Sequence, residues 1–286
     1  MAAQAYHVTE PQALRSCVVF ASPHSGREYP AAFLRATVLD EHAVRSSEDA
    51  FVDQLFAPAP EFGAAFLSAG APRAFVDLNR AYDELDPALI EGVRRAGHNP
   101  RIASGLGVIP RVVANGRAIY RGKLSRSEAE ERIALYWKPY HTKLQALLDA
   151  AHQRHGQAVL IDCHSMPREA IDGVVKAGMK RPDVVLGDRF GAAASGDVVD
   201  RVEAAFVGAG FTVTRNTPFA GAYITQAYGR PARGQHAVQV EIDRSLYMNE
   251  TLIRPNGTFE EVRTALRQVV AEIARIGEGR VPLAAE

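Results

Sequence analysis

The residues best suited to chemistry in this sequence follow a short apolar run. Residues 159–161 lead directly into Asp162, Cys163, His164 and Ser165, which is the pattern of a buried strand that opens into a loop. Because residues two apart in a strand share a face, Asp162 and His164 point the same way and Cys163 points to the other face. An imidazole beside a carboxylate, at a strand end where open α/β sheets place ligands, suits a metal ligand or a catalytic base. The alternative is a structural histidine that caps a loop through a hydrogen bond.

A second histidine occupies the same kind of position. The apolar residues 17–21 end at Ser22, Pro23 and His24, so a second buried strand is predicted to carry a histidine to the edge of the sheet. Two histidines and one carboxylate are a common ligand set for a catalytic zinc ion. The sequence contains no HExxH segment, so a zinc site here requires distant segments to meet.

Two adjacent acids, Glu48 and Asp49, are candidates for the carboxylate ligand. They precede residues 51–56, whose apolar positions have helical spacing, and Ser46 or Ser47 is the predicted N-cap of that helix. In the first turn of the helix both acids would complement its dipole, which is a commonplace role. The alternative is that one of them supplies an oxygen ligand to a metal.

A further acid lies inside a predicted strand. Residues 236–243 have the pattern of a strand in which Glu241 has apolar neighbours, and a carboxylate there needs a partner to offset its lost solvation. A separate Glu of this kind can act as the general base for a metal-activated water, while an Arg stabilises the oxyanion. The alternative is that Glu241 is buried to pair with Arg244. Polar residues that flank another strand, predicted at 74–78, are Arg73, Asn79 and Arg80.

The remaining patterns predict an α/β chain of one domain. Strands are predicted at 17–21, 64–68, 74–78, 159–163, 184–187, 211–214 and 236–243, and helices at about 125–154, 195–210 and 258–275. We expect a single domain over residues 1–286, with a surface insertion at about 81–121 in which Asn115 and Gly116 predict a hairpin that could cover the site as a flap. His141, inside the first long helix, is predicted to be structural or exposed. Residues 216–234, rich in Gly, Pro and aromatic side chains, are predicted to contact substrate.

The composition excludes several classes of function. Lys plus Arg and Asp plus Glu number 33 each, so no net field attracts nucleic acid or an anionic membrane, and a small-molecule partner is expected. Cys17 and Cys163 are too few for a disulfide framework and favour a reducing compartment. The sequence shows no secretory leader and no run of apolar residues long enough to span a membrane, so a soluble, cytoplasmic protein is expected.

Seven short motifs occur in order between about residue 18 and residue 248. They are Pro23–Gly26, Glu48–Asp49 with Val52–Asp53 and Leu55, Asp77–Arg80, Pro139–His141, Asp162–Pro167, Asn216–Ile224, and Gln239–Arg244 with Leu246–Met248. Each is weakly specific alone, but together they resemble the N-formylglutamate amidohydrolase family. That family looks like a branch of the zinc carboxypeptidase and aspartoacylase group. The resemblance therefore implies a phosphorylase/hydrolase-like fold, with a mixed β-sheet flanked by helices.

The resemblance also implies a metal site, with zinc or another divalent metal as cofactor. The implied ligands are His24, Asp49 and His164. The wider group takes its third ligand from a Glu three residues after the first histidine, but Arg27 holds that position here. Asp49 is the choice for the third ligand because the pattern of the resembled family has an acid at this position, and Glu48 and Glu28 are the alternatives.

The other implied roles concern the substrate. Glu241 would be the general base, and Arg73 would polarise the carbonyl group. Asn79 and Arg80 would hold the substrate carboxylate, as the similar segment of aspartoacylases does. The remaining substrate-binding candidates are Arg215, Tyr223 and Arg244.

The activity that the resemblance implies is hydrolysis of N-formyl-L-glutamate to formate and L-glutamate, a step of histidine degradation. The sequence departs from dedicated formylglutamate hydrolases beside Phe219, where Pro218 and Ala220 replace basic residues. One alternative is a zinc carboxypeptidase or deacylase that acts on another N-acyl amino acid or peptide. An alternative of another class is a non-catalytic ligand-binding protein with this fold.

Overall fold

The computed structural model describes residues 4–94, 97, 99–173 and 180–278. The chain forms two compact units from interleaved segments. Unit 1 comprises Met1–His7, Pro23–Ala50 and Ser68–Lys143, and unit 2 comprises Val8–Ser22, Phe51–Leu67 and Leu144–Glu286. The expectation of a single domain with an insertion at about 81–121 stays a prediction.

A seven-stranded sheet has the strand order β1-β3-β2-β4-β7-β5-β6. Its strands are β1 (Tyr6–Thr9), β2 (Val18–Ser22), β3 (Ala65–Ala69), β4 (Ala158–Met166), β5 (Val184–Gly187), β6 (Val213–Arg215) and β7 (Gln235–Asp243). The central strands β2, β4 and β7 are parallel, whereas β5 runs antiparallel to β7. The sheet is therefore mixed, which confirms the predicted fold class.

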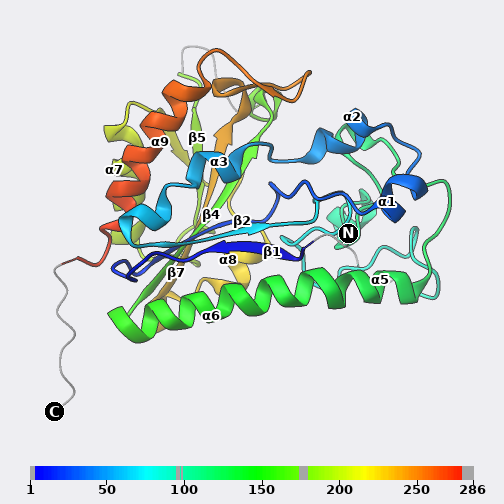
Figure 1. Ribbon diagram of the computed structural model, residues 1–286, viewed down its shortest axis with the longest axis horizontal. Coiled ribbons are helices and arrows are strands. Elements are labelled where there is room, and N and C mark those ends of the chain that lie inside the picture. Colours follow the sequence, from blue (N-terminus) through cyan, green and yellow to red (C-terminus); the bar gives the residue numbers. More distant parts are fainter. Residues whose placement is uncertain (1–3, 95–96, 98, 174–179, 279–286) are drawn as a thin grey trace. The chain divides into compact units, whose positions relative to one another are not determined.

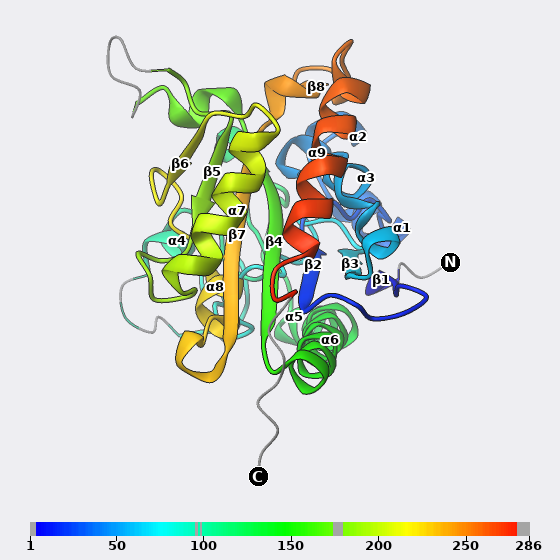
Figure 2. The ribbon, with the colours of Figure 1, turned by 90° about the vertical axis from the view of Figure 1, so that its left-hand side faces the viewer.

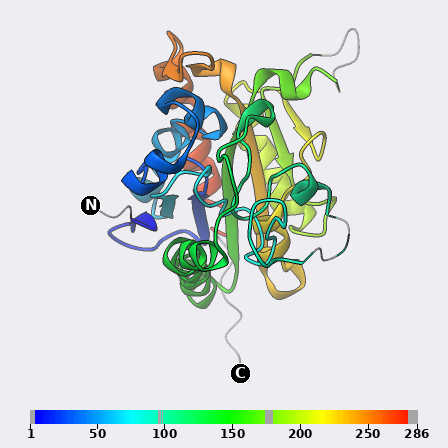
Figure 3. The ribbon, with the colours of Figure 1, turned by 90° about the vertical axis from the view of Figure 1, so that its right-hand side faces the viewer.

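The two longest strands lie at the centre of the sheet. Figures 2 and 3 show β4 (green) and β7 (orange) side by side from opposite directions. Every residue of β4 is buried, and so is every residue of β7 after the first. Strands buried on both faces are typical of a sheet that is covered by helices on both sides.

Helices of unit 2 cover this sheet, and α7 and α9 lie on the side of the sheet that faces the viewer in Figure 2. The helices of unit 2 are α3 (Val52–Phe56), α7 (Gly196–Gly208), α8 (Tyr223–Tyr228), α9 (Phe259–Ala274) and most of α6 (Lys138–His155). The buried residues of α9 include Leu266, Val269, Val270 and Ile273, which recur at the spacing of one helix face. The helix predicted at 258–275 is therefore confirmed as α9, and it buries one face.

Short elements complete the structure (Figure 1). They are the helices α1 (Ala31–Ala36), α2 (Glu41–Val44), α4 (Pro100–Ala103) and α5 (Arg126–Arg132), the 3-10 turns Arg45–Ser47, Ala59–Phe62, Ala114–Gly116, Arg168–Ile171, Pro231–Arg233 and Arg244–Leu246, the π-helical turn Ile133–Trp137, and the two-stranded pair β8 (Met248–Asn249) and β9 (Arg254–Pro255). Among the described residues, no helix combines the length and the apolar character that a membrane span requires.

Two of the predicted elements near the candidate residues are wrong. Residues 74–78 form turns instead of a strand, because the backbone N–H groups of Phe75 and Val76 both donate to the carbonyl of Pro72. Helix α3 begins only at Val52, after Phe51 with a φ of 68°, so neither serine caps it and Glu48 and Asp49 precede the helix. The two acids therefore do not complement the dipole of that helix.

Of the hairpin predicted at 108–120, only the turn is present. Asn115 and Gly116 have positive φ values of 60° and 69°, as their residue types predict. The flanking residues make only one isolated bridge, between Val112 and Ala118, and form no strands. This segment also contributes buried side chains such as Val108 and Ile119.

Candidate active site

In unit 1, His24 lies between two carboxylates. Its Nε2 atom is 2.7 Å from Oδ1 of Asp77, and its Nδ1 atom is 3.5 Å from Oδ2 of Asp49. All three side chains are buried. If Nε2–H donates to Asp77, as this short contact indicates, Nδ1 is the nitrogen that carries the lone pair. The lone pair of Nδ1 and the carboxylate of Asp49 then approach one another, which is favourable only if a cation or a proton lies between them.

Asp77 organises this part of unit 1. Its carboxylate accepts hydrogen bonds from His24, from Nε of Arg73 at 3.1 Å, and from the backbone N–H of Asn79 at 2.8 Å. Burial by itself raises the pKa of Asp77, but the charges of Arg73, His24 and Arg80 outweigh burial and hold the pKa well below its usual range. Asp77 is therefore ionised and holds the ring of His24. The sequence interpretation assigned Asp77 no such role, although an acid inside the apolar residues 74–78 is the same signal that singled out Glu241.

The helix that starts at Arg126 fixes the turn that carries Asp77. Ser125 caps this helix, since its hydroxyl accepts from the backbone N–H of Glu128 at 3.1 Å. Three side chains of the helix donate to backbone carbonyls of residues 75–80, at 2.8 to 3.2 Å. These bonds join Arg132 to Phe75, Trp137 to Arg80, and His141 to Leu78.

His141 is structural, as one of the two sequence alternatives stated. Its ring packs against Trp137 with the centroids 3.9 Å apart and the planes tilted by 32°, and its Nε2 bonds to the carbonyl of Leu78. Burial lowers the pKa of His141 to about 4, and the bond to Leu78 opposes this shift only in part. His141 is therefore neutral at neutral pH.

We expect His141 to make the folded state sensitive to acid. Its folded pKa is depressed, so its contribution to stability is complete above the unfolded pKa of about 6.5 and is lost as the pH falls toward 4. Between pH 7.5 and pH 5 the loss amounts to about 2 kcal/mol in the free energy of unfolding. Denaturant unfolding at both pH values measures it, with His141→Gln as the non-titrating control. An equal pH dependence in the two proteins would contradict the prediction.

Asn79 and Arg80 lie in the same fixed turn. The guanidinium of Arg80 donates from Nε to the carbonyl of Leu106 at 2.9 Å and from Nη1 to the carbonyl of Asn79 at 2.7 Å. Its Nε atom is 3.9 Å from Glu84, and burial lowers the pKa of the guanidinium. Arg80 is therefore a buried, oriented cation.

Glu48 and Glu28, the alternative third ligands, have other partners. Glu48 is buried and accepts from the hydroxyl of Tyr29 and from the guanidinium of Arg45. Glu28 is partly exposed and bonds to His7 and to the backbone N–H of Gln4. These contacts favour Asp49 as the carboxylate ligand.

In unit 2, four polar side chains lie in register on β4 and β7. Asp162 is paired with Gln239, and His164 is paired with Glu241. Nε2 of His164 is 3.0 Å from Oδ1 of Asp162, and Nε2 of Gln239 donates to Oε1 of Glu241 at 2.8 Å. Since residues two apart share a face and paired residues of parallel strands point the same way, all four side chains are on one face. The strand β4 extends through Met166, so His164 lies within the strand and not in the loop that was expected.

Cys163 points to the other face of β4 and is buried. Burial, with a smaller contribution from the charge of Asp162, raises the pKa of the Cys163 thiol well above its usual range. A thiol of this kind is a poor nucleophile, so Cys163 acts as a small apolar residue.

The remaining substrate-binding candidates are also in unit 2. Arg244 is buried at the end of β7 and donates from Nε to the hydroxyl of Ser165 at 3.0 Å. Tyr223 is the first residue of α8 and is half-buried. Arg215 on β6 forms ion pairs with Asp200 and Glu203 of α7. The assignment of all three to substrate binding stays a prediction.

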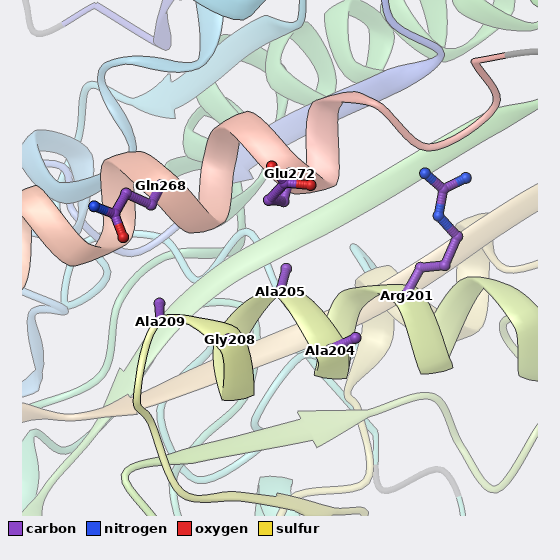
Figure 4. A pocket seen from close by; sticks show the side chains of 7 residues that line it. All are labelled: Arg201, Ala204, Ala205, Gly208, Ala209, Gln268 and Glu272. Carbon is purple, nitrogen blue, oxygen red and sulfur yellow. The ribbon is translucent and has the colours of Figure 1, made fainter.

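His24, Asp49 and His164 are all buried and make up a set of two imidazoles and one carboxylate that could bind a metal ion. A separate hollow lies between α7 and α9 (Figure 4). It is lined by Arg201, Ala204, Ala205, Gly208, Ala209, Gln268 and Glu272. None of the candidate residues lines this hollow, so it is not the candidate active site.

A mixed α/β sheet that carries an imidazole, a nearby carboxylate and a buried glutamate on adjacent strands has the groups that acid–base hydrolysis uses. The sequence model of the N-formylglutamate amidohydrolase family matches residues 16–248. The chain belongs to this family, and it is a hydrolase that acts on an amide.

Two curated relatives, both named N-formylglutamate deformylase, cover most of the chain. The protein of Pseudomonas aeruginosa is 30% identical over 264 residues, which are 90% of each chain. The protein of Pseudomonas putida is 31% identical over 237 residues, which are 82% of each chain.

Solved structures show the same architecture. The N-formylglutamate amidohydrolase of Ralstonia eutropha JMP134 is 34% identical, with a TM-score of 0.88 over 95% of this chain and 97% of that chain. A gene product of Agrobacterium tumefaciens, 18% identical with a TM-score of 0.56 over 94% of each chain, shares the fold.

Proposed function

We propose that this chain hydrolyses N-formyl-L-glutamate to formate and L-glutamate with the help of a bound divalent metal. Support for the substrate comes from the names of the relatives, which match over 82% to 97% of their lengths at 30% to 34% identity. The single observation that carries the chemistry is the pairing of His164 with Glu241 on adjacent parallel strands. This register supports the proposal because it brings a carboxylate, the proposed base, beside a proposed metal ligand.

The proposed ligands are His24, Asp49 and His164, and zinc is the proposed metal. The chemistry of this donor set fits zinc, because two histidines and one carboxylate leave a position open for catalysis. In both imidazoles Nε2 lies against a carboxylate, of Asp77 for His24 and of Asp162 for His164. Carboxylates in that position fix the orientation of a metal-binding histidine and increase its basicity.

The proposed reaction uses Glu241 as the general base. Glu241 accepts a proton from water while the water oxygen bonds to the formyl carbon, and it then gives this proton to the amide nitrogen as the C–N bond breaks. When bound, the metal supplies a positive charge that polarises the carbonyl and makes the water easier to deprotonate. Arg73, held by Asp77, is proposed to stabilise the negative charge that develops on the carbonyl oxygen.

The carboxylates of the substrate need cations and hydrogen-bond donors. We propose Asn79, Arg80 and Arg244 for this role, with Tyr223 and Arg215 as further substrate-binding residues. Arg80 and Arg244 are the better candidates among the three arginines because both are buried, whereas Arg215 is already paired with two carboxylates.

A second candidate function is hydrolysis of another N-acyl amino acid or peptide. The segment beside Phe219 favours it, because Pro218 and Ala220 give this segment no cation for the side-chain carboxylate of glutamate. Phe219 itself packs on a buried apolar cluster of Met166, Ile171 and Val185. The two candidates share the same metal and base and differ only in the substrate.

A substrate series tests the proposal. We expect kcat/KM for N-formyl-L-glutamate to exceed that for N-acetyl-L-glutamate and for N-formyl-L-glutamine by about tenfold or more, since each change removes a fitted or charged contact. Metal content is measured on the same preparation. Faster turnover of the acetyl compound or the side-chain amide would favour the second candidate. A metal-loaded protein that binds these compounds without turnover would instead be a ligand-binding protein.

We further propose the cytoplasm as the location and histidine degradation as the pathway. Cys17 and Cys163 are both buried and form no disulfide, which fits a reducing compartment. The pathway rests on the family alone.

A further inference from the structure

The side-chain amide of Gln239 connects the proposed base to the start of α8. Its Nε2 donates to Oε1 of Glu241 at 2.8 Å, and its Oε1 accepts from the backbone N–H of Ala222 at 2.9 Å. Gln239 is buried, with 4% of its surface exposed. A buried amide has a large cost if either end lacks its partner, so both bonds are needed in the folded protein.

The two partners also fix the direction of the amide. In the opposite orientation the NH₂ group would face the N–H of Ala222, and the carbonyl oxygen would face the carboxylate of Glu241. Both contacts would then pair like with like, donor against donor and acceptor against acceptor. The orientation observed is thus the one that the neighbours permit.

The segment that carries Ala222 is itself held in place. The hydroxyl of Thr225 donates to the carbonyl of Ala222 at 2.8 Å, and the backbone N–H of Arg189 donates to the carbonyl of Ala220 at 2.7 Å. Ala222 therefore presents its N–H to Gln239 from a fixed position. Tyr223, a proposed substrate-binding residue, follows Ala222 directly as the first residue of α8.

We infer that Gln239 is a positioning residue for the reaction: its amide binds Oε1 of Glu241 and so orients the carboxylate that exchanges the proton with water and the amide nitrogen. This inference rests on the proposed role of Glu241 and extends it. A hydrogen bond from a neutral amide orients a carboxylate and leaves its negative charge in place. A Lys or Arg in the same position would neutralise that charge and so weaken the base. The same amide keeps the base in register with the start of α8, and so with Tyr223.

Two variants of Gln239 separate its two bonds. Gln239→Met keeps the length of the side chain and removes both bonds. Gln239→Glu keeps the acceptor for Ala222 and replaces the neutral amide donor by a second carboxyl group, which shares a proton with Glu241 and so takes up the charge that the base needs. We expect both to lower kcat by about 10-fold to 100-fold, the usual effect of losing a residue that orients a catalytic group, with KM and metal content nearly unchanged. If Gln239→Met does not fold, Gln239→Glu alone carries the test. The control is Thr225→Val, which loosens the start of α8 and leaves the bond to Glu241 in place.

The decisive measurement is a double-mutant cycle with Glu241→Gln. If Gln239 acts through Glu241, the loss in kcat caused by Gln239→Met disappears in the Glu241→Gln background. An equal loss in both backgrounds, or a loss matched by Thr225→Val, would overturn the inference and leave Gln239 a residue of the fold only. Wild-type kcat in Gln239→Glu would overturn it as well. Failure of the proposed role of Glu241 can be distinguished from failure of this inference. If Glu241 is not the base, the Glu241→Gln variant itself retains turnover.

Discussion

Replacing Glu241 by Gln is expected to leave the metal in place and to lower kcat by about 10² to 10⁴, the usual range for a missing general base. The variant has nearly the same shape, and Gln239 can still donate to its amide oxygen. It lacks only the carboxylate oxygen that takes the proton from water. The measurements are kcat for N-formyl-L-glutamate and the metal content of the same preparation.

The control for this variant is Glu261→Gln, an exposed carboxylate in the first turn of α9. It removes the same charge from unit 2 without touching β7, so its turnover should equal that of the wild type. The competing interpretation is that Glu241 is buried to serve the fold. In that case Glu241→Gln would lower the melting temperature while turnover of the folded fraction stayed near the wild-type value, and Glu241 would no longer be a catalytic candidate.

Replacing His164 by Ala is expected to abolish both metal binding and turnover. A site with three protein ligands that loses one of them usually binds its metal too weakly to retain it through purification. We expect about one metal per chain in the wild type and almost none in the variant. The loss of activity should exceed that of Glu241→Gln, because the electrophile is lost together with the group that makes water acidic. Elemental analysis and kcat are the two measurements, and His24→Ala should give the same result.

A matched control is His42→Ala, which removes an exposed imidazole from α2. It should retain the metal and full turnover. Incubating the wild type with a strong chelator should reproduce the loss of activity, and added zinc should restore it. Full activity in the chelated protein, or an unchanged metal content in His164→Ala, would contradict the metal mechanism.

The sequence alone predicted the elements that hold the central polar residues. Buried strands at β2, β4, β5 and β7 follow from short apolar runs, and the helices α7 and α9 lie within the predicted ranges 195–210 and 258–275. His24, His164 and Glu241 were found because an ionisable residue within or just after an apolar strand is unusual. That signal is local, so no knowledge of the fold was needed to read it.

Tertiary contacts decided the conformation around Asp77. Residues 74–78 have the composition of a strand, yet they form turns that Arg132, Trp137 and His141 hold by their backbone carbonyls. The partners are more than 50 residues away in sequence, with separations of 57, 57 and 63. The side-chain donors bind the backbone carbonyls that a neighbouring strand would otherwise pair with. These hydrogen bonds therefore outweigh the preference of residues 74–78 for a strand.

Partners that are distant in sequence also explain why Asp77 and Gln239 were not assigned their roles from the sequence. Each is an ordinary polar residue until its partners are known: Asp77 orients His24 across 53 positions, and Gln239 connects Glu241 to Ala222, 17 positions away. Residue type and spacing determined which groups could bind a metal or move a proton. The fold determined which nitrogen of each histidine faces a carboxylate and which end of the amide faces the base, because hydrogen-bond direction depends on where the partner lies and not on sequence separation.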